Sequence, residues 1–157
     1  MEVRKPSQNQ LKELASLYLA NNVITLGKDE KTIVSNLRRH LRKDTLLAAV
    51  ENKEIASAIV AINTWGFEDH KTWELRHFVL KPDCYNRGFA ESLVKIIENR
   101  IRPQSETCKI FIIVPEKEKD LELFKRMHFK TEGNIPNYYV YGENCVFMGK
   151  TFRKTEA

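Results

Sequence analysis

Residues 72–114 combine a strand pattern, a helix pattern and a second strand pattern, and this order restricts the fold more than any other part of the chain. The apolar run "CKIFIIV", which ends the segment, predicts a strand buried on both faces beside a parallel partner. The first strand, "TWELRHFVL", alternates so that one face carries Glu74, Arg76, Phe78 and Leu80. The helix between the strands has apolar residues at helical spacing, namely Ala90, Leu93, Val94, Ile97 and Ile101. We therefore expect a parallel strand pair joined by a helix.

Before this segment, the sequence predicts a short strand, two helices and a hairpin. Residues 2–6 form the strand, Ser7 is a suitable N-cap for the first helix, and the second helix begins near Asp29. Two apolar runs flank the polar turn "ENKE" and predict an antiparallel hairpin over residues 45–65. The residues that the two helices should bury are Leu11, Leu14, Ala15 and Tyr18 in the first and Ile33, Val34, Leu37 and Leu41 in the second.

After the parallel pair, residues 116–127 predict another helix, and residues 132–152 predict a hairpin that turns at Gly142 and Glu143. The predicted order of elements is β-α-α-β-β-β-α-β-α-β-β. Because this order mixes antiparallel segments with one crossover, the expected fold class is α+β with a mixed sheet. The length of 157 residues suits one domain, which we expect to span residues 1–157.

The composition excludes several classes of protein. Hydrophobic residues make up 42% and charged residues 30% without any repeat, so neither disorder nor a repeat array is expected. No apolar stretch approaches the roughly 20 residues that span a bilayer, and the first ten residues lack the apolar core of a signal peptide. We therefore expect a cytoplasmic protein with no membrane partner. The cysteines Cys84, Cys108 and Cys145 lack C-x-x-C spacing, so neither disulfides nor a metal site is expected.

The loop over residues 81–91 enters the long central helix with small residues at Gly88 and Ala90. The first amides of a helix have no carbonyl partner within it, and together with the helix dipole they attract anions. Arg87 could add a positive charge. In the alternative interpretation, Gly88 only permits a tight turn and Arg87 is solvated. Because neither G-K-[ST] nor G-x-G-x-x-G occurs here, an anion would be held chiefly by the backbone.

This loop resembles the phosphate-binding motif of the GNAT superfamily, the N-acetyltransferases that use acetyl-coenzyme A (acetyl-CoA). The positions that match the motif are Leu80, Pro82, Gly88, Ala90 and Leu93. The predicted order of elements over the whole chain is also similar to that of the family. The resemblance implies a GNAT-like fold with a splayed central parallel pair, and acetyl-CoA as co-substrate.

The same resemblance implies which residues would contact the coenzyme. The first strand of the pair would offer main-chain groups of Phe78, Val79 and Leu80 to the pantetheine arm, as an added strand would pair. Tyr85 stands where the family has Arg or Gln, and it either stacks or caps the loop. The amides that would hold the pyrophosphate belong to Asn86, Arg87, Gly88, Phe89, Ala90 and Glu91.

Acetyl transfer to an amine requires a base, and two residues are candidates. Glu74 is similar in placement to the glutamate of histone-type members of the family; the alternative is a surface carboxylate paired with Arg76 or Lys71. His77 has a side chain suited to base work at neutral pH, although a structural histidine is the equally open alternative.

The acid that would protonate the leaving thiolate is a tyrosine in many members of the family, and Phe124 stands at that position here. Phenylalanine has no proton to donate. Phe124 is still expected beside the coenzyme, and the acid role passes to Tyr138, to Tyr139 or to solvent.

The resemblance implies an acetyl-CoA dependent N-acetyltransferase that acts on a primary amine of a small molecule or peptide by direct attack in a ternary complex. The alternative, suggested by Phe124, is a CoA-binding regulatory or interaction module with little or no transferase activity. The net charge of +5 and the basic run over residues 36–43 raise a third class, but no nucleic-acid motif is present, so no nucleic-acid partner is expected. Many members of the family dimerise, and a homodimer is compatible with this resemblance.

Overall fold

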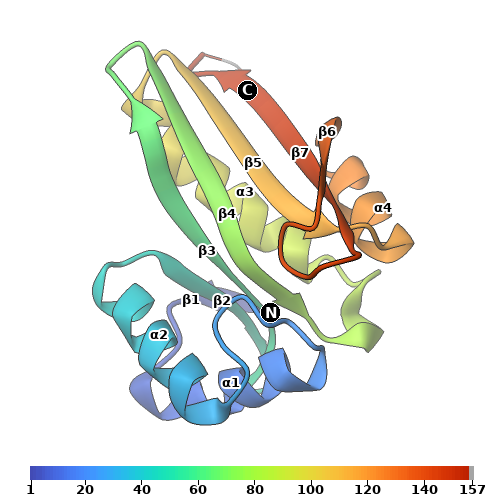
Figure 1. Ribbon diagram of the computed structural model, residues 1–157. Coiled ribbons are helices and arrows are strands. Elements are labelled where there is room, and N and C mark those ends of the chain that lie inside the picture. The colour runs from blue at the N-terminus through green and yellow to red at the C-terminus, as the bar shows by residue number, and fades with distance from the viewer. Residues whose placement is uncertain (156–157) are drawn as a thin grey trace. The chain divides into compact units, whose positions relative to one another are not determined.

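The computed structural model describes residues 1–155, which form seven strands and four α-helices (Figure 1). This order confirms the predicted one, with short 3-10 helices added before α1 and after β4 and α3. In chain order the elements are β1 (Glu2–Arg4), α1 (Leu11–Ala20), α2 (Glu30–Arg42), β2 (Leu46–Glu51), β3 (Glu54–Gly66), β4 (His70–Leu80), α3 (Phe89–Ile101), β5 (Thr107–Pro115), α4 (Glu118–Arg126), β6 (Lys130–Pro136) and β7 (Asn144–Arg153).

The strands form one mixed sheet with the order β1-β2-β3-β4-β5-β7-β6. β4 and β5 pair in parallel, whereas β1 with β2, β2 with β3, β5 with β7 and β6 with β7 pair antiparallel. The helix α3 connects the two parallel strands, because such strands need a crossover. The parallel register ends at Leu75 and Ile112 before either strand ends, which agrees with the expected splay. The predicted α+β class is confirmed.

The chain divides into two compact units, which are described separately below. Unit 1 comprises residues 1–61 and 77–96, and unit 2 comprises residues 62–76 and the described residues from 97 onward. β3, β4 and α3 contribute residues to both units. That residues 1–157 act as one domain stays a prediction. Residues 156 and 157 lie outside the described residues.

In unit 1, α1 and α2 lie side by side (Figure 1). Each helix buries an apolar face. α2 begins after its N-cap Asp29, whose carboxylate accepts a hydrogen bond of 2.9 Å from an amide of the first turn. It buries Ile33 and Leu37. Val34 and Leu41, which were predicted to be buried, are half-buried because both lie on one edge of the apolar stripe. The residues that α1 buries are the predicted Leu11, Leu14, Ala15 and Tyr18.

The predicted hairpin of unit 1 is present as β2 and the first part of β3. Its two-residue turn consists of Asn52 and Lys53, which have φ angles of 51° and 68°. Positive φ at both positions is the geometry of a tight hairpin turn whose twist matches the strands. The polar turn "ENKE" was therefore read correctly.

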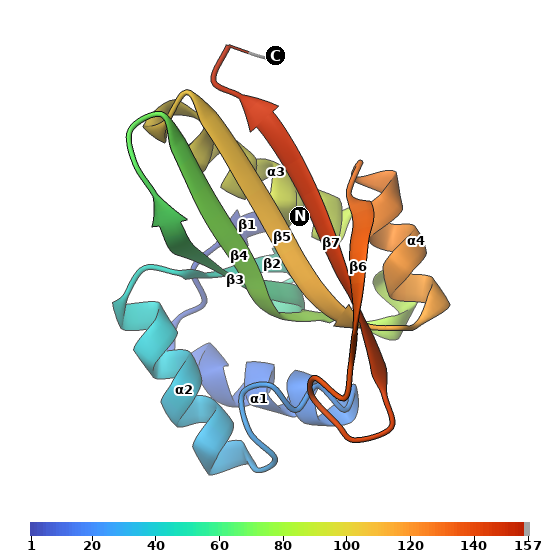
Figure 2. The same ribbon diagram turned by 45° about the horizontal axis from the view of Figure 1, so that its top comes forward.

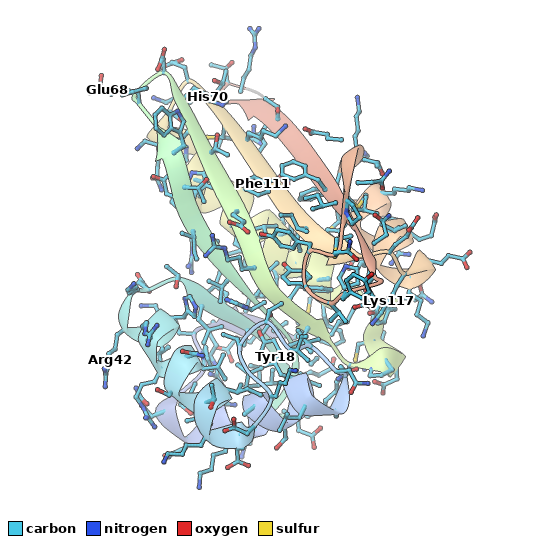
Figure 3. All side chains as sticks on the ribbon, viewed as in Figure 1. Tyr18, Arg42, Glu68, His70, Phe111 and Lys117 are labelled. Carbon is cyan, nitrogen blue, oxygen red and sulfur yellow. The ribbon has the colours of Figure 1, made fainter. Side chains whose placement is uncertain are left out.

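In unit 2, β5 lies between β4 and β7 (Figure 2). Its burial alternates from residue to residue. The prediction of a strand buried on both faces is wrong for one face, because the side chains between the buried positions are half-buried. On that face Phe111, marked in Figure 3, stacks on Phe147 with ring centroids 4.7 Å apart. The fully buried side chains of β5 are Cys108, Ile110, Ile112 and Val114.

The hairpin of β6 and β7 is present, but its predicted turn at Gly142 and Glu143 is only the end of a longer loop. β6 ends at Pro136 and β7 begins at Asn144, so residues 137–143 connect them. Asn137 closes this loop: its amide donates to the Glu143 carbonyl and its side chain accepts from the Gly142 amide, both at 2.8 Å. The loop brings Tyr138 and Tyr139 beside the strands of unit 2, as described below.

Gly66 sets the end of β3 in unit 2, and its replacement gives the first testable prediction. Its φ is 141°, and a Cβ at this position would lie 2.3 Å from the His70 carbonyl oxygen. Because that contact is with backbone, it cannot be relieved by a side-chain rotation. We expect Gly66→Ala to lower the free energy of unfolding by roughly 2 kcal/mol or more, measured by denaturant titration.

The matched control for this prediction is Gly133→Ala in β6. A Cβ on Gly133 would meet nothing within 4 Å, and its φ lies outside the left-handed region. The control should change stability by less than about 0.5 kcal/mol. Equal stabilities of the two variants would contradict the interpretation of Gly66.

Candidate active site

The loop before α3 belongs to unit 1 and turns the chain into the helix at Gly88. Pro82 to Cys84 form a 3-10 turn, and Gly88 then adopts a φ of 79°, which a residue with a side chain rarely adopts. The Ser92 amide donates to the Gly88 carbonyl at 3.1 Å, so regular helical bonding begins there. A Cβ built on Gly88 would meet nothing within 4 Å. The loop therefore leaves open space beside Gly88, next to the start of α3, where an anion could approach the helix.

Arg87 does not bring an uncompensated positive charge to this loop. Its guanidinium forms an ion pair with Glu51 and lies 5.0 Å from the centroid of the Phe89 ring. The alternative interpretation, in which the Arg87 side chain is only solvated, is also incomplete, because this side chain makes both of these contacts. An anion at this position would therefore depend mainly on backbone amides and the helix dipole. Tyr85 is half-buried and Asn86 is exposed.

The end of β4 in unit 1 directs its main-chain groups to two different edges. The carbonyl of Val79 accepts a hydrogen bond of 2.7 Å from the buried Ser57 hydroxyl, on the β3 side. Because successive peptide groups of a strand point in opposite directions, those of Phe78 and Leu80 face the other edge. Of the three residues predicted to pair with a pantetheine arm, Phe78 and Leu80 therefore have the suitable direction.

His77 interrupts β4, and the predicted alternation of the strand up to Leu80 is wrong at this point. The φ of His77 is 53°, in the left-handed region, where a residue does not continue the pleat. Its ring nitrogen Nδ1 lies 2.8 Å from the Thr25 hydroxyl, and its ring packs against His40 with centroids 5.2 Å apart. These contacts favour the structural alternative for His77 over the role of base.

Glu74 lies in unit 2 on β4 and is paired with Arg76. The Arg76 guanidinium is 2.6 Å from Oε2 of Glu74, and this hydrogen bond raises the pKa of Arg76 above its usual value. Glu74 is only 8% exposed. The predicted partner Arg76 is therefore present, but the carboxylate is not on the surface as the alternative assumed. A buried carboxylate with one charged partner is a suitable position for proton chemistry.

Tyr138 and Tyr139 from the loop of residues 137–143 stand near this pair in unit 2. Their rings meet edge to face with centroids 4.7 Å apart, and Tyr138 is 47% exposed. The Tyr139 hydroxyl lies 3.4 Å from the Ile113 carbonyl. Burial raises the pKa of Tyr139 to about 12, and the charges of Tyr138 and Glu74 add to the shift. The structure thus brings three of the four predicted catalytic residues together, and adds Arg76, which sequence reasoning treated only as a surface partner.

The high pKa of Tyr139 gives a second testable prediction. Alkaline titration of the tyrosine absorbance should show a step near pH 12 that is absent in Tyr139→Phe and retained in Tyr141→Phe. Since the folded-state pKa lies above the unfolded value of 10.0, the stability associated with the neutral phenol is complete below pH 10 and is lost toward pH 12. Tyr139→Phe should therefore lose less stability over this interval. An identical titration curve for this variant would contradict the assignment.

Phe124 and two cysteines limit the remaining chemistry. Phe124 on α4 is fully buried and meets the Phe129 ring edge to face at 5.4 Å, and its expected contact with the coenzyme stays a prediction. Burial raises the pKa of the Cys84 and Cys145 thiols, which disfavours the thiolate form that a nucleophile needs.

In the part of the chain that the structure describes, no cluster of three or more His, Cys, Asp or Glu residues could hold a metal ion. No described helix is long and apolar enough to cross a membrane.

Comparison with known proteins provides a family match. A family model described as "Acetyltransferase (GNAT) family" matches residues 11–129. No curated protein is similar enough in sequence to count as a relative. Three similar solved structures are an aminoglycoside 6'-acetyltransferase type Ii (18% identity, 100% of this chain and 99% of that chain, TM-score 0.71), a ribosomal-protein-alanine N-acetyltransferase from Brucella melitensis (15%, 97% and 100%, 0.72), and an aminoglycoside 6'-N-acetyltransferase complexed with coenzyme A (16%, 96% and 97%, 0.71). At these identities the likeness shows a common fold.

Proposed function

We propose, from the premise that this chain belongs to the acetyltransferase (GNAT) family, that it moves an acetyl group from acetyl-CoA to a primary amine of a small molecule or peptide. The observation that carries the proposal is the loop before α3. Gly88 there holds a left-handed backbone, and the space around it, next to the start of the helix, is open. Such a site accepts a pyrophosphate through backbone donors.

The residues of unit 1 fit the binding of the coenzyme. The amides of residues 86–91 would hold the pyrophosphate, with Tyr85 packed at the start of the loop. The peptide groups of Phe78 and Leu80 face the edge of β4 that an extended pantetheine arm would join. When bound, acetyl-CoA supplies the activated acetyl group. Since the Arg87 charge is paired with Glu51, the affinity should depend on the loop backbone more than on this side chain.

In unit 2, Glu74 is the proposed base. Its carboxylate would accept the proton of the attacking amine, directly or through water, while Arg76 fixes its orientation. His77 is the weaker candidate because its ring is bonded to Thr25. The amine attacks the thioester directly, without a covalent enzyme intermediate.

The proposed acid is Tyr138, or else solvent. With a pKa of about 12, Tyr139 is a poor proton donor to a thiolate whose conjugate thiol has a pKa of about 8.5. Tyr139 would instead donate a hydrogen bond and support the Tyr138 ring. This division of roles compensates for the missing hydroxyl at Phe124.

The acceptor is proposed as a class only. Among structures with this fold, one is named for aminoglycosides and one for the alanine of a ribosomal protein, so both small molecules and peptides are represented. We further propose that residues 1–157 act as one domain in this reaction. A cytoplasmic location, a homodimer and the absence of a nucleic-acid partner stay predictions.

The proposal is tested by incubating the protein with acetyl-CoA and a panel of primary amines, including aminoglycosides and short peptides, and measuring free thiol. Amine-dependent thiol release supports transfer. A failure to bind CoA in calorimetry would contradict the proposal, because the loop before α3 would then lack its ligand.

A second candidate function is a CoA-binding module with little transferase activity, and the buried Phe124 favours it. This candidate predicts tight CoA binding with no amine-dependent thiol release. It also predicts that Glu74→Gln changes nothing in the assay.

A further inference from the structure

Tyr18 makes an unusual contact with the interrupted part of β4. It lies on α1 (Figure 3) and is fully buried, and its hydroxyl donates a hydrogen bond to the carbonyl oxygen of His77. Burial raises the pKa of Tyr18, so the phenol stays neutral and acts as a donor. Both residues belong to unit 1. A buried polar group held in this way fixes the carbonyl to which it is bonded.

The carbonyl of His77 determines the direction of one amide. The peptide bond between His77 and Phe78 is planar and trans, since no described peptide bond is cis. Its C=O and N–H therefore point in opposite directions. When Tyr18 holds the carbonyl of His77, the amide of Phe78 must point away from α1.

The conformation of His77 needs such support. A left-handed φ at a residue with a Cβ costs of order 1 kcal/mol and persists only where surrounding contacts enforce it. Tyr18 acts on the backbone of His77, and Thr25 and His40 contact its ring. A left-handed residue held by three separate side chains marks a place where the direction of the main chain matters.

We infer that Tyr18 is a positioning residue for acetyl transfer: its hydroxyl holds the peptide group between His77 and Phe78 so that the Phe78 amide donates to the thioester carbonyl of acetyl-CoA. This inference rests on the proposed function and adds a residue that lies outside the coenzyme loop. An amide in this direction would stabilise the carbonyl oxygen as negative charge develops on it during attack by the amine. Tyr18 would act only through this peptide group and would touch neither substrate.

The test compares Tyr18→Phe with Ser57→Ala. Tyr18→Phe removes only the hydroxyl and keeps the buried ring. Ser57→Ala removes another fully buried hydroxyl that donates to a β4 carbonyl, that of Val79, in the regular part of the strand. Each variant should lower the thermal midpoint of the protein by about 2–4 °C, so that the two variants lose a similar amount of stability.

The readout is the affinity for two inert analogues, measured by calorimetry. One is the ketone analogue of acetyl-CoA in which a methylene replaces the sulfur, and the other is S-ethyl-CoA, which lacks the carbonyl oxygen. The wild-type protein should bind the ketone about tenfold more tightly than S-ethyl-CoA. Ser57→Ala should keep this preference. Tyr18→Phe should reduce it to about twofold or less and lower kcat about tenfold or more, with the Kd of CoA changed by less than about twofold.

Each other outcome rejects a specific statement. If Tyr18→Phe keeps both the preference for the ketone and the wild-type kcat, Tyr18 is only a stabilising residue and the inference is wrong. If Ser57→Ala loses the preference as well, the effect is a general loosening of β4, and the inference is also wrong. If the wild-type protein binds neither analogue nor CoA, the proposed function itself is wrong, and the inference falls with it.

Discussion

Replacement of Glu74 by glutamine is expected to lower kcat for acetyl transfer by about 10²-fold or more. Glutamine keeps the size of the side chain but cannot accept the proton of the attacking amine. The Kd of CoA, measured by calorimetry, should stay within about twofold of the wild-type value, since no part of the proposed coenzyme site includes Glu74. Part of the lost rate should return at higher pH, where more of the amine is already neutral.

The control for this prediction is Glu132→Gln. Glu132 is a second carboxylate of unit 2 that forms an ion pair with a cationic side chain, that of Lys109, and it has no role in the proposed chemistry. Its replacement should leave kcat within about twofold of the wild-type value. Equal losses in both variants would mean that the rate depends on paired charges in general and would reject Glu74 as the base.

The second large effect is expected on coenzyme affinity from Gly88→Ala. The methyl group would project into the open space beside residue 88, next to the start of α3, and the φ of 79° would be strained. We expect the Kd of CoA to rise about tenfold or more, because the pyrophosphate must approach these amides closely.

Gly142→Ala provides a matched control for that measurement. Gly142 has a φ of 86°, and a Cβ there would also meet nothing within 4 Å, so the backbone strain is comparable. It lies in the loop of residues 137–143, away in sequence from the coenzyme loop. Its replacement should leave the Kd of CoA within about twofold. If both variants bind CoA as tightly as the wild-type protein, the proposed pyrophosphate site is wrong.

The parts of the fold that depend on local sequence were predictable. The buried face of α1, including Tyr18, follows from helical spacing, and the turn at Asn52 and Lys53 follows from its length and polar composition. The order of elements follows from the same local patterns. Each of these features is determined by residues close to one another in the chain.

Features set by distant residues were not predictable in this way. The apolar run of β5 is compatible with a second face that is covered by a helix. It is equally compatible with the observed face, on which Phe111 forms a half-exposed aromatic stack with Phe147. The left-handed φ of His77 is not visible in an alternating pattern, and the residues that contact His77, such as Tyr18 on α1, are distant in the chain. The loop between β6 and β7 is a local exception: Asn137 closes it through hydrogen bonds with Gly142 and Glu143, which the hairpin pattern does not indicate.

The same distinction between local and distant residues applies to the candidate site. Gly88 and the helix that follows it pointed to an anion from sequence alone, because the small residue and the helix start are adjacent. The pairing of Arg87 with Glu51 and the electrostatic influence of Glu74 on Tyr139 required the tertiary structure, since these residues are far apart in the chain.

The central claim is that this protein transfers acetyl groups to amines, and isotope transfer tests it most directly. The protein is incubated with acetyl-CoA labelled in the acetyl carbonyl and with a mixture of primary amines, and the products are analysed by mass spectrometry. The proposal predicts a labelled N-acetyl amine that forms with the wild-type protein and at least about 10²-fold more slowly with Glu74→Gln. Tight binding of CoA with no labelled amine from any acceptor class would contradict it and favour the CoA-binding module.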